Sequence, residues 1–288
     1  MKKLALFILL SVSMPCLAQT GSEIILFNLK EKKGKIQISG PENITRHPGY
    51  DNQPSFHPTK DLLYYTSFNE EGRADIKSYN MATGQTKNIT QTAEREYSPT
   101  VTPDGQFLSC IIQRDNGAQD LGKYPIEGGQ ASTIINDLIV GYHVWADNSH
   151  LALFILGKDG APNTLHYLRL PTRSDTILAE NIGRSLHRVP GEESVSYIAK
   201  INKERWEIRK FNIHTFKNER IAEALHGKED ICWTPKGTIL SSDGQSLFML
   251  DNGSWKQVSY KGDASFLKGI TRLAVNKKGN KLAVVVSE

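Results

Sequence analysis

The sequence predicts an all-β fold, namely a six-bladed β-propeller with four-stranded blades. Three observations predict it. A segment of about 44 residues recurs six times, and each copy has the pattern of four short strands separated by turn residues. Beyond residues 1–18, no stretch of the sequence shows a long helical period. A single four-stranded sheet cannot bury both of its faces, so successive copies are expected to pack face to face around a common axis.

Two marker positions establish the repeat. An apolar residue before a turn recurs at spacings of 45, 44, 44, 44 and 42, at Phe56, Val101, Trp145, Val189, Trp233 and Val275. A second apolar position recurs at spacings of 45, 45, 43, 44 and 37, at Ile44, Ile89, Ile134, Ile177, Ile221 and Val258. The second series includes the tripeptide Asn-Ile-Thr at 43–45 and 88–90, so the repeat explains both copies without glycosylation.

The first complete copy shows the four strands in order. An inner strand ending at 54–56 precedes a turn, 62–66 is rich in residues that suit a buried strand, 75–79 alternates with period two, and 87–90 ends the copy. The same order recurs at 107–112, 120–124 and 132–135, and again at 151–156, 165–170 and 176–178. We therefore expect each blade to run outward from the axis through four antiparallel strands.

The two ends of the sequence complement each other. The last copy has only its first two strands, the one that ends at Val275 and one more, which leaves it as half a blade. Residues 23–28 match a third strand, and 35–38 with 43–45 match a fourth. We expect these amino-terminal outer strands to join the carboxy-terminal inner strands, because closing the ring in this way removes exposed sheet edges.

The repeat resembles a known family. The segment Pro-Thr-Val-Thr-Pro-Asp-Gly-Gln-Phe-Leu at 99–108, Asp-Asn-Gly at 115–117 and Asp-Leu at 120–121 are similar to the repeat of TolB-type, WD40-like propellers. The resemblance covers residues 19–288, is strongest in the first three copies and fades in the fourth, where 189–193 replace the usual turn. It implies a six-bladed propeller without the small α/β domain that TolB carries before its propeller, and it concerns the fold more than the function.

Residues 1–18 have the form of a signal peptide, with two lysines, an apolar run over 4–14 and a small residue, Ala18, at the expected cleavage site. Cleavage after Ala18 predicts a periplasmic or secreted protein, and residues 19–288 then form a single propeller domain. Lipidation at Cys16 is the alternative export route. No other long apolar segment follows, so we expect no stable membrane insertion.

Charge and cysteine content narrow the possible partners. Without Lys2 and Lys3 the chain has 33 basic and 31 acidic residues, a balance that gives no reason to expect a nucleic-acid partner. Cys110 and Cys232 fall in the second and fifth copies, across the ring from each other, and a disulfide requires α-carbons within about 7 Å. We therefore expect Cys110 and Cys232 to be buried free thiols. We also expect the protein to be a monomer.

Candidate site residues come from the loops that precede the inner strands. These loops should gather at one mouth of the central channel, and they carry charged and aromatic residues suited to hydrogen bonding a polar partner. A solvated rim is the alternative interpretation. The predicted ligand-binding residues are Asp51, Glu96, Tyr97, Tyr142, His143, Arg184, His187, Asp230 and Arg272.

His143 and His187 are the only candidates for a metal site. They lie one 44-residue repeat apart, and two imidazoles near the axis can bind a transition metal, as axial histidines do in the oligogalacturonate lyases that this repeat also resembles. Packed or mouth-lining histidines are the alternative. The equivalent positions in the other copies offer no third ligand, so we expect no cofactor; they are Pro54, Pro99, Ile231 and Leu273.

The sequence favours a non-catalytic binding propeller that takes a protein, peptide or glycan ligand at one mouth of the channel. It contains no G-x-S-x-G motif, and no segment outside the repeats that could build an α/β-hydrolase domain. The alternative is a metal-dependent lyase or hydrolase that acts on a polysaccharide or an ester at the axis.

Overall fold

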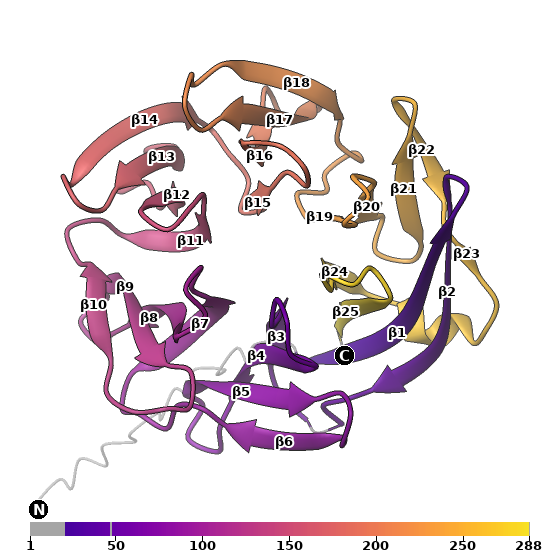
Figure 1. Ribbon diagram of the computed structural model, residues 1–288, viewed down its shortest axis with the longest axis horizontal. Coiled ribbons are helices and arrows are strands. Elements are labelled where there is room, and N and C mark those ends of the chain that lie inside the picture. Colours follow the sequence, from indigo (N-terminus) through magenta and orange to yellow (C-terminus); the bar gives the residue numbers. More distant parts are fainter. Residues whose placement is uncertain (1–20, 47, 288) are drawn as a thin grey trace, which may run out of the picture.

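The computed structural model describes residues 21–46 and 48–287, and the predicted signal peptide at 1–18 lies outside them. The described residues form six β-sheets, which stand radially around a central axis (Figure 1). The predicted six-bladed propeller is therefore confirmed. No helix in the described part of the chain is long and apolar enough to cross a membrane.

Blades 1 to 3 follow the predicted order from the axis outward. Blade 1 consists of β3 (Asp51–Phe56), β4 (Leu62–Phe68), β5 (Ala74–Asn80) and β6 (Gln85–Asn88). Blade 2 consists of β7 (Arg95–Val101), β8 (Phe107–Gln113), β9 (Gln119–Pro125) and β10 (Ser132–Ile135). Blade 3 consists of β11 (Val140–Trp145), β12 (His150–Ile155), β13 (Thr164–Arg169) and β14 (Ser174–Glu180).

Blades 4 and 5 keep this order with shorter inner strands. Blade 4 consists of β15 (His187–Arg188), β16 (Ser194–Lys200), β17 (Trp206–Asn212) and β18 (Asn218–Glu223). Blade 5 consists of β19 (Ile231–Trp233), β20 (Ile239–Ser242), β21 (Leu247–Asp251) and β22 (Ser254–Gln257). The inner strand of blade 4 is only two residues long, and it leads directly into the Val-Pro-Gly turn where the repeat fades.

Blade 6 closes the ring with both ends of the chain. Its two inner strands are β24 (Ile270–Val275) and β25 (Lys281–Ser287), and its two outer strands are β1 (Ser22–Lys32) and β2 (Lys35–Asn43). Antiparallel pairing of β1 with β25 sets Ile25 opposite Val284, which confirms the predicted closure. A 3-10 helix, η1 (Ala264–Leu267), precedes β24.

One feature of blade 6 differs from the prediction of four strands. A short segment, β23 (Ser259–Tyr260), pairs in parallel with β2 and becomes a fifth strand. Tyr260 packs its ring edge-on against Phe27 of β1, with 5.6 Å between the ring centroids. The linker between blades 5 and 6 therefore covers the outer edge of the closing sheet and blunts it against further strand pairing.

The apolar core lies between neighbouring blades. The largest cluster joins blades 5 and 6 and includes Phe27, Leu240, Leu282 and Val284, all fully buried. Another joins blades 3 and 4 through Tyr197 and Phe211. Cys110 and Cys232 are buried free thiols, as predicted. Because each sheet is covered by its neighbours, the inner strands are held in fixed positions around the axis.

The repeated Asn-Ile-Thr tripeptide has a structural role at the end of the outer strand. Thr90 Oγ1 accepts a hydrogen bond from the backbone N–H of Ile76 at 2.8 Å, and Thr45 Oγ1 accepts one from Ile24 at 3.1 Å. In both blades the threonine satisfies a third-strand N–H where the regular ladder ends. The tripeptide therefore recurs because it completes the blade.

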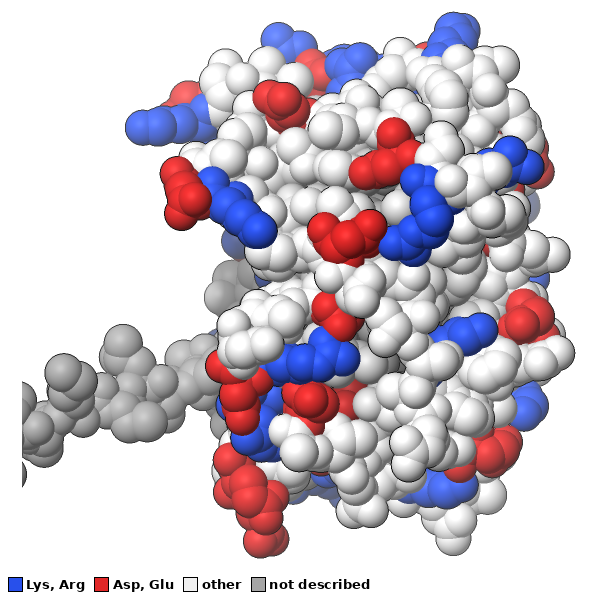
Figure 2. Space-filling model, turned by 90° about the vertical axis from the view of Figure 1, so that its left-hand side faces the viewer, with Lys and Arg blue, Asp and Glu red and all other residues white. Residues whose placement is uncertain are grey.

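Figure 2 shows the outer wall of the ring around β10 and β14. Acidic and basic side chains are interspersed over this face, without a large patch of one sign. Such a surface gives no preference for a strongly charged polymer. The features that set this propeller apart lie at the axis.

Candidate functional site

A cavity of about 650 Å³ occupies the central channel. All six blades contribute to its wall, mostly through their innermost strands. About half of the lining residues are polar or charged and the rest are apolar or aromatic; the wall includes Phe56, Tyr142, Val144, His187, Trp233 and Val275. Because these strands are fixed by the packing between blades, the cavity is built into the fold.

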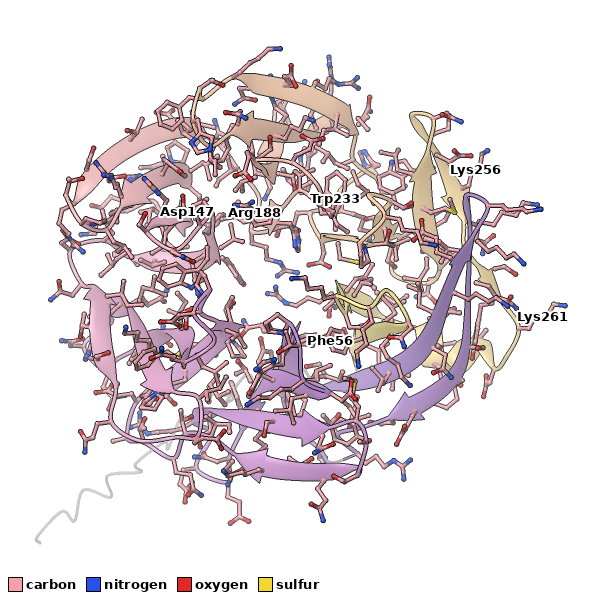
Figure 3. The ribbon with its side chains drawn as sticks, in the orientation of Figure 1. Phe56, Asp147, Arg188, Trp233, Lys256 and Lys261 are labelled. Atoms are coloured by element: carbon pink, nitrogen blue, oxygen red, sulfur yellow. The ribbon has the colours of Figure 1, made fainter. Side chains whose placement is uncertain are left out.

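The cavity opens between the loops that join the first and second strands of the blades. We call this end the open mouth and define it by Pro58, Pro190, Pro235 and Lys277. Pro58, Pro235 and Lys277 are exposed to solvent. Figure 3 shows Phe56, Arg188 and Trp233 around the central opening, whereas Lys256 and Lys261 lie at the outer rim.

Tight turns create the open mouth. Each connects the inner strand of a blade to its second strand, and in blades 2, 4, 5 and 6 it contains a glycine in the left-handed region, for example Gly237 with φ 87° in blade 5. The preceding Pro235 lines the cavity and cannot donate a backbone hydrogen bond. Pro235 therefore adds a rigid, apolar contact to an entrance whose turns are otherwise largely polar.

The other end of the cavity is bridged by side chains. We call it the bridged end and define it by Tyr142, Arg184, Asp230 and Arg272. Arg272 on β24 donates a hydrogen bond through Nη2 to the hydroxyl of Tyr142 on β11, at 2.7 Å. Its guanidinium carbon lies 5.1 Å from the centroid of that ring. Since these strands belong to blades 6 and 3, the contact spans the channel.

Two further hydrogen bonds hold the bridged end together. Arg184 Nη2 donates to the backbone oxygen of Thr271 at 3.3 Å, and Asp230 Oδ2 accepts from the backbone N–H of Leu273 at 2.8 Å. A second hollow of about 220 Å³ lies behind this group and shares Arg184, Asp230 and Arg272 as its wall. The bridge therefore separates two spaces along the channel.

Burial changes the acid–base properties of this end. It raises the pKa of Asp230 to about 6, although the nearby Arg272 and Arg184 act in the opposite direction. Burial also raises the pKa of Tyr50, which lies beside the same arginines, to about 12. Desolvation thus outweighs attraction at both groups.

His143 and His187 lie in the cavity wall in neighbouring blades, as predicted. Each is held by a serine, with 2.7 Å from His143 Nε2 to Ser109 Oγ and 2.9 Å from His187 Nε2 to Ser185 Oγ. Burial lowers the pKa of both imidazoles to about 4. Within residues 21–46 and 48–287, no three His, Cys, Asp or Glu side chains come together as a metal-binding group.

The structure brings six of the nine predicted site residues to the cavity wall. They are Tyr142, His143, Arg184, His187, Asp230 and Arg272. The other three, Asp51, Glu96 and Tyr97, lie outside this wall. Glu96 is fully buried inside blade 2, where its carboxylate accepts a hydrogen bond from Tyr124 at 2.8 Å, and Tyr97 packs against the core around Ile111.

Backbone strain marks the cavity wall in blades 1 and 2. Gln53 and Ser98 occupy the same repeat position, and both adopt left-handed backbone angles, with φ 57° and 55°. Gln53 Oε1 accepts the N–H of Ser98 at 2.7 Å and so couples the two blades. Left-handed angles at residues other than glycine are uncommon and tend to cluster at functional sites.

Several wall residues were missed because the sequence analysis used them only to count repeats. Phe56, Trp233 and Val275 are marker residues that end inner strands, and this position places them beside the open mouth. The signal was therefore present in the repeat itself. Arg188 and Lys277 lie next to marker positions and could have been found in the same way.

Comparison with known proteins identifies the fold. No family model matches the sequence, and no curated protein matches it. Among solved structures, a putative TolB from Agrobacterium tumefaciens superimposes with a TM-score of 0.70 at 14% identity, covering 94% of this chain and 99% of that one. The chain has the fold of a TolB-like six-bladed propeller.

Other solved structures that this fold resembles include enzymes. An oligogalacturonate lyase in complex with manganese gives a TM-score of 0.60 at 13% identity, over 88% of this chain and 83% of that one. A gluconolactonase from Xanthomonas campestris gives 0.62 at 10% identity, over 94% and 99%. At such identities the likeness concerns the fold alone, so function has to be argued from the cavity.

Proposed function

We propose that this chain is an exported, non-catalytic TolB-like propeller that takes part of a protein, peptide or glycan ligand into its axial cavity through the open mouth. The observation that carries the proposal is the cavity itself. Its volume of about 650 Å³ lies within the usual range for ligand sites, roughly 300 to 1,000 Å³.

The composition of the wall supports binding. Apolar and aromatic groups such as Phe56 and Trp233 offer contact area, and the indole N–H of Trp233 is already satisfied by Ser196 Oγ at 2.9 Å. The wall is therefore preorganised, and a ligand does not need to order it. Export is proposed from residues 1–18, whose pattern is that of a signal peptide.

The alternative function, a metal-dependent lyase or hydrolase at the axis, draws on one observation. His143 Nδ1 is buried in the cavity wall and makes no hydrogen bond to any described residue. Elemental analysis of untagged protein tests this alternative. About one equivalent of a transition metal that is lost in the double variant His143→Asn and His187→Asn would favour the enzyme over the binding module.

Filling the cavity tests the proposed function directly. Ser55 lines the cavity on β3, whereas Gln85 is exposed on the outer strand β6 of the same blade. Wild-type protein, Ser55→Trp and Gln85→Trp would be screened against immobilised hexapeptides and oligosaccharides. We expect ligands that bind wild-type protein and Gln85→Trp but not Ser55→Trp. Equal binding by both variants would place the ligand outside the cavity and contradict the proposal.

A further inference from the structure

The cavity wall carries an excess of positive charge. Four cationic side chains contribute to it, whereas Asp230 is its single carboxylate among the described residues. The cations are Arg184, Arg188, Arg272 and Lys277. His143 and His187 are neutral near pH 7 because burial lowers their pKa to about 4. The cavity is therefore cationic, whereas the outer face in Figure 2 carries mixed charges.

The two arginines at the bridged end are only partly satisfied by the protein. Arg272 makes no ion pair within 4.0 Å among the described residues, and its hydrogen bond goes to the neutral hydroxyl of Tyr142. Arg184 approaches a carboxylate only at 3.7 Å, from Nε to Glu229 Oε1. A guanidinium has five N–H donors, so both retain unused hydrogen-bonding capacity.

Arg184 is also incompletely hydrogen-bonded at its Nε, although the Glu229 carboxylate lies 3.7 Å from that atom. Its Nε is buried and makes no hydrogen bond to the described residues. Unsatisfied buried donors are uncommon in folded proteins, because burying one without a partner is costly. The carboxylate of Asp230 is engaged by the backbone N–H of Leu273 and makes no ion pair within 4.0 Å with either arginine.

We propose that the bridged end of the cavity is a carboxylate site, where Arg184 and Arg272 bind the acidic side chain or free carboxyl terminus of a peptide that enters through the open mouth. This inference rests on the proposed function and specifies its ligand. Guanidinium groups suit the task because they bind carboxylates with two parallel hydrogen bonds.

The rest of the cavity wall favours a peptide as the ligand that bears this carboxylate. The innermost strands β3, β7, β11, β15, β19 and β24 are sheet edges that face the axis, so the backbone groups that neighbouring blades do not already bond, as they do at Ser98 and Leu273, are open to an extended chain. Around them, Phe56, Val144 and Trp233 offer apolar contacts to side chains. A peptide can use both features, with its carboxylate at the bridged end.

A hexapeptide library tests this proposal. Each set has one position fixed as Asp, Asn, Glu, Gln or Lys, and is made with either a free carboxyl terminus or a carboxamide. Peptides that bind would be synthesised again as matched acid and amide pairs, and their Kd values measured by calorimetry. We expect the acid to bind at least about tenfold more tightly than its amide, since hydrogen bonds to charged groups are strong.

Variants assign this preference to particular residues. In Arg272→Gln and in Arg184→Gln the preference should fall below about threefold, whereas Lys261→Gln at the outer rim should keep it. Two separate arginine variants are used so that a folding defect in one does not decide the result. If Lys261→Gln lost the preference as well, the assignment to the bridged end would be overturned.

The outcomes separate this proposal from the proposed function. Cavity-dependent binding of acid and amide peptides with equal affinity would overturn the carboxylate site and leave the binding propeller intact. Binding of uronic acid oligosaccharides without any peptide would also overturn it. If no peptide or glycan bound the wild-type protein, both proposals would be contradicted.

Discussion

The two ends of the axial channel are built from the same inner strands, yet they differ in chemistry. The open mouth is formed by turns and carries proline, aromatic side chains and an exposed lysine. The bridged end is formed by residues at or just before the start of the inner strands. It carries arginine, aspartate and tyrosine, and Arg272 contacts Tyr142 across the ring. We propose that a ligand enters through the open mouth and stops at the bridged end.

This difference shows how a repeat can produce an asymmetric site. Each blade supplies a residue at the level of Tyr142 and Arg272, which meet across the channel from blades 3 and 6. The equivalent residues of the other blades have shorter side chains; they are Gln53, Ser98, Leu186 and Asp230. A few departures from the repeat thus change the local chemistry on a scaffold that the repeat fixes.

The largest effect on stability is expected at the open mouth. Trp233→Ala removes a half-buried indole and its hydrogen bond to Ser196, and should lower the free energy of unfolding by about 3 kcal/mol. Urea denaturation measures this. Trp255→Ala, on the outer strand of the same blade, is the comparison, since its indole N–H makes an exposed bond to Glu223. A larger loss of stability in Trp255→Ala than in Trp233→Ala would show that the residues around the open mouth are not tightly packed.

The next effect concerns the dependence of stability on pH. Folding lowers the pKa of His143 and His187 from 6.5 to about 4, so between these values the unfolded chain binds more protons and stability rises with pH. Folding raises the pKa of Asp230 from 3.8 to about 6, which opposes this rise between pH 4 and 6. Because two histidines act against one aspartate, the net contribution of these three groups should be a rise in stability with pH.

Two variants separate these contributions. Replacing one histidine, as in His187→Gln, should flatten the rise by about 2 kcal/mol between pH 4 and 6.5. Asp230→Asn should steepen it over the lower part of that range. Thermal or urea unfolding at fixed ionic strength provides the measurement. A rise in stability that is unchanged in His187→Gln would show that His187 titrates normally in the folded protein.

A smaller loss of stability is expected when the hydrogen bond between Arg272 and Tyr142 is removed. Tyr142→Phe removes the hydroxyl that accepts from Arg272 and should cost about 1 kcal/mol of stability. Tyr260→Phe is the control, because its hydroxyl donates to Asp263 in an exposed contact, and its cost should stay below about 0.5 kcal/mol. Equal costs for the two variants would mean that the bridge adds nothing to stability.

The smallest effect is expected at the rim of the open mouth. Lys277 is exposed, and none of the ion pairs within 4.0 Å among the described residues includes it. Lys277→Gln should therefore change the free energy of unfolding by less than about 0.5 kcal/mol. A loss above about 1 kcal/mol in urea denaturation would show that this lysine supports the fold, contrary to its assignment as a free group.

Most of the fold could be predicted because repeat spacing is a direct consequence of blade geometry. Two marker series fixed the number of blades, and the match of 23–28 to a third strand fixed the closure. The fifth strand of blade 6 could not be predicted, because β23 is only two residues long and pairs through its backbone. Such short pairings leave no pattern in the side chains.

The candidate site was predicted less completely for a specific physical reason. Inner strands contain irregularities in register, between Asn52 and Ser55 in blade 1 and between Tyr97 and Thr100 in blade 2. Each one changes which side chains point to the axis, and a bulge has no fixed sequence signature. Glu96 therefore faces the blade interior, whereas Arg272 faces the channel.

The measurement that tests the account most directly blocks one end of the channel at a time. Lys277→Cys places a thiol at the open mouth, Lys268→Cys places one before β24 at the opposite end, and the native Cys110 and Cys232 are buried. Each variant would be alkylated with a bulky maleimide and titrated with a peptide or glycan that binds wild-type protein. The account predicts that the label at 277 abolishes binding while the label at 268 leaves it unchanged, and the reverse result would contradict it.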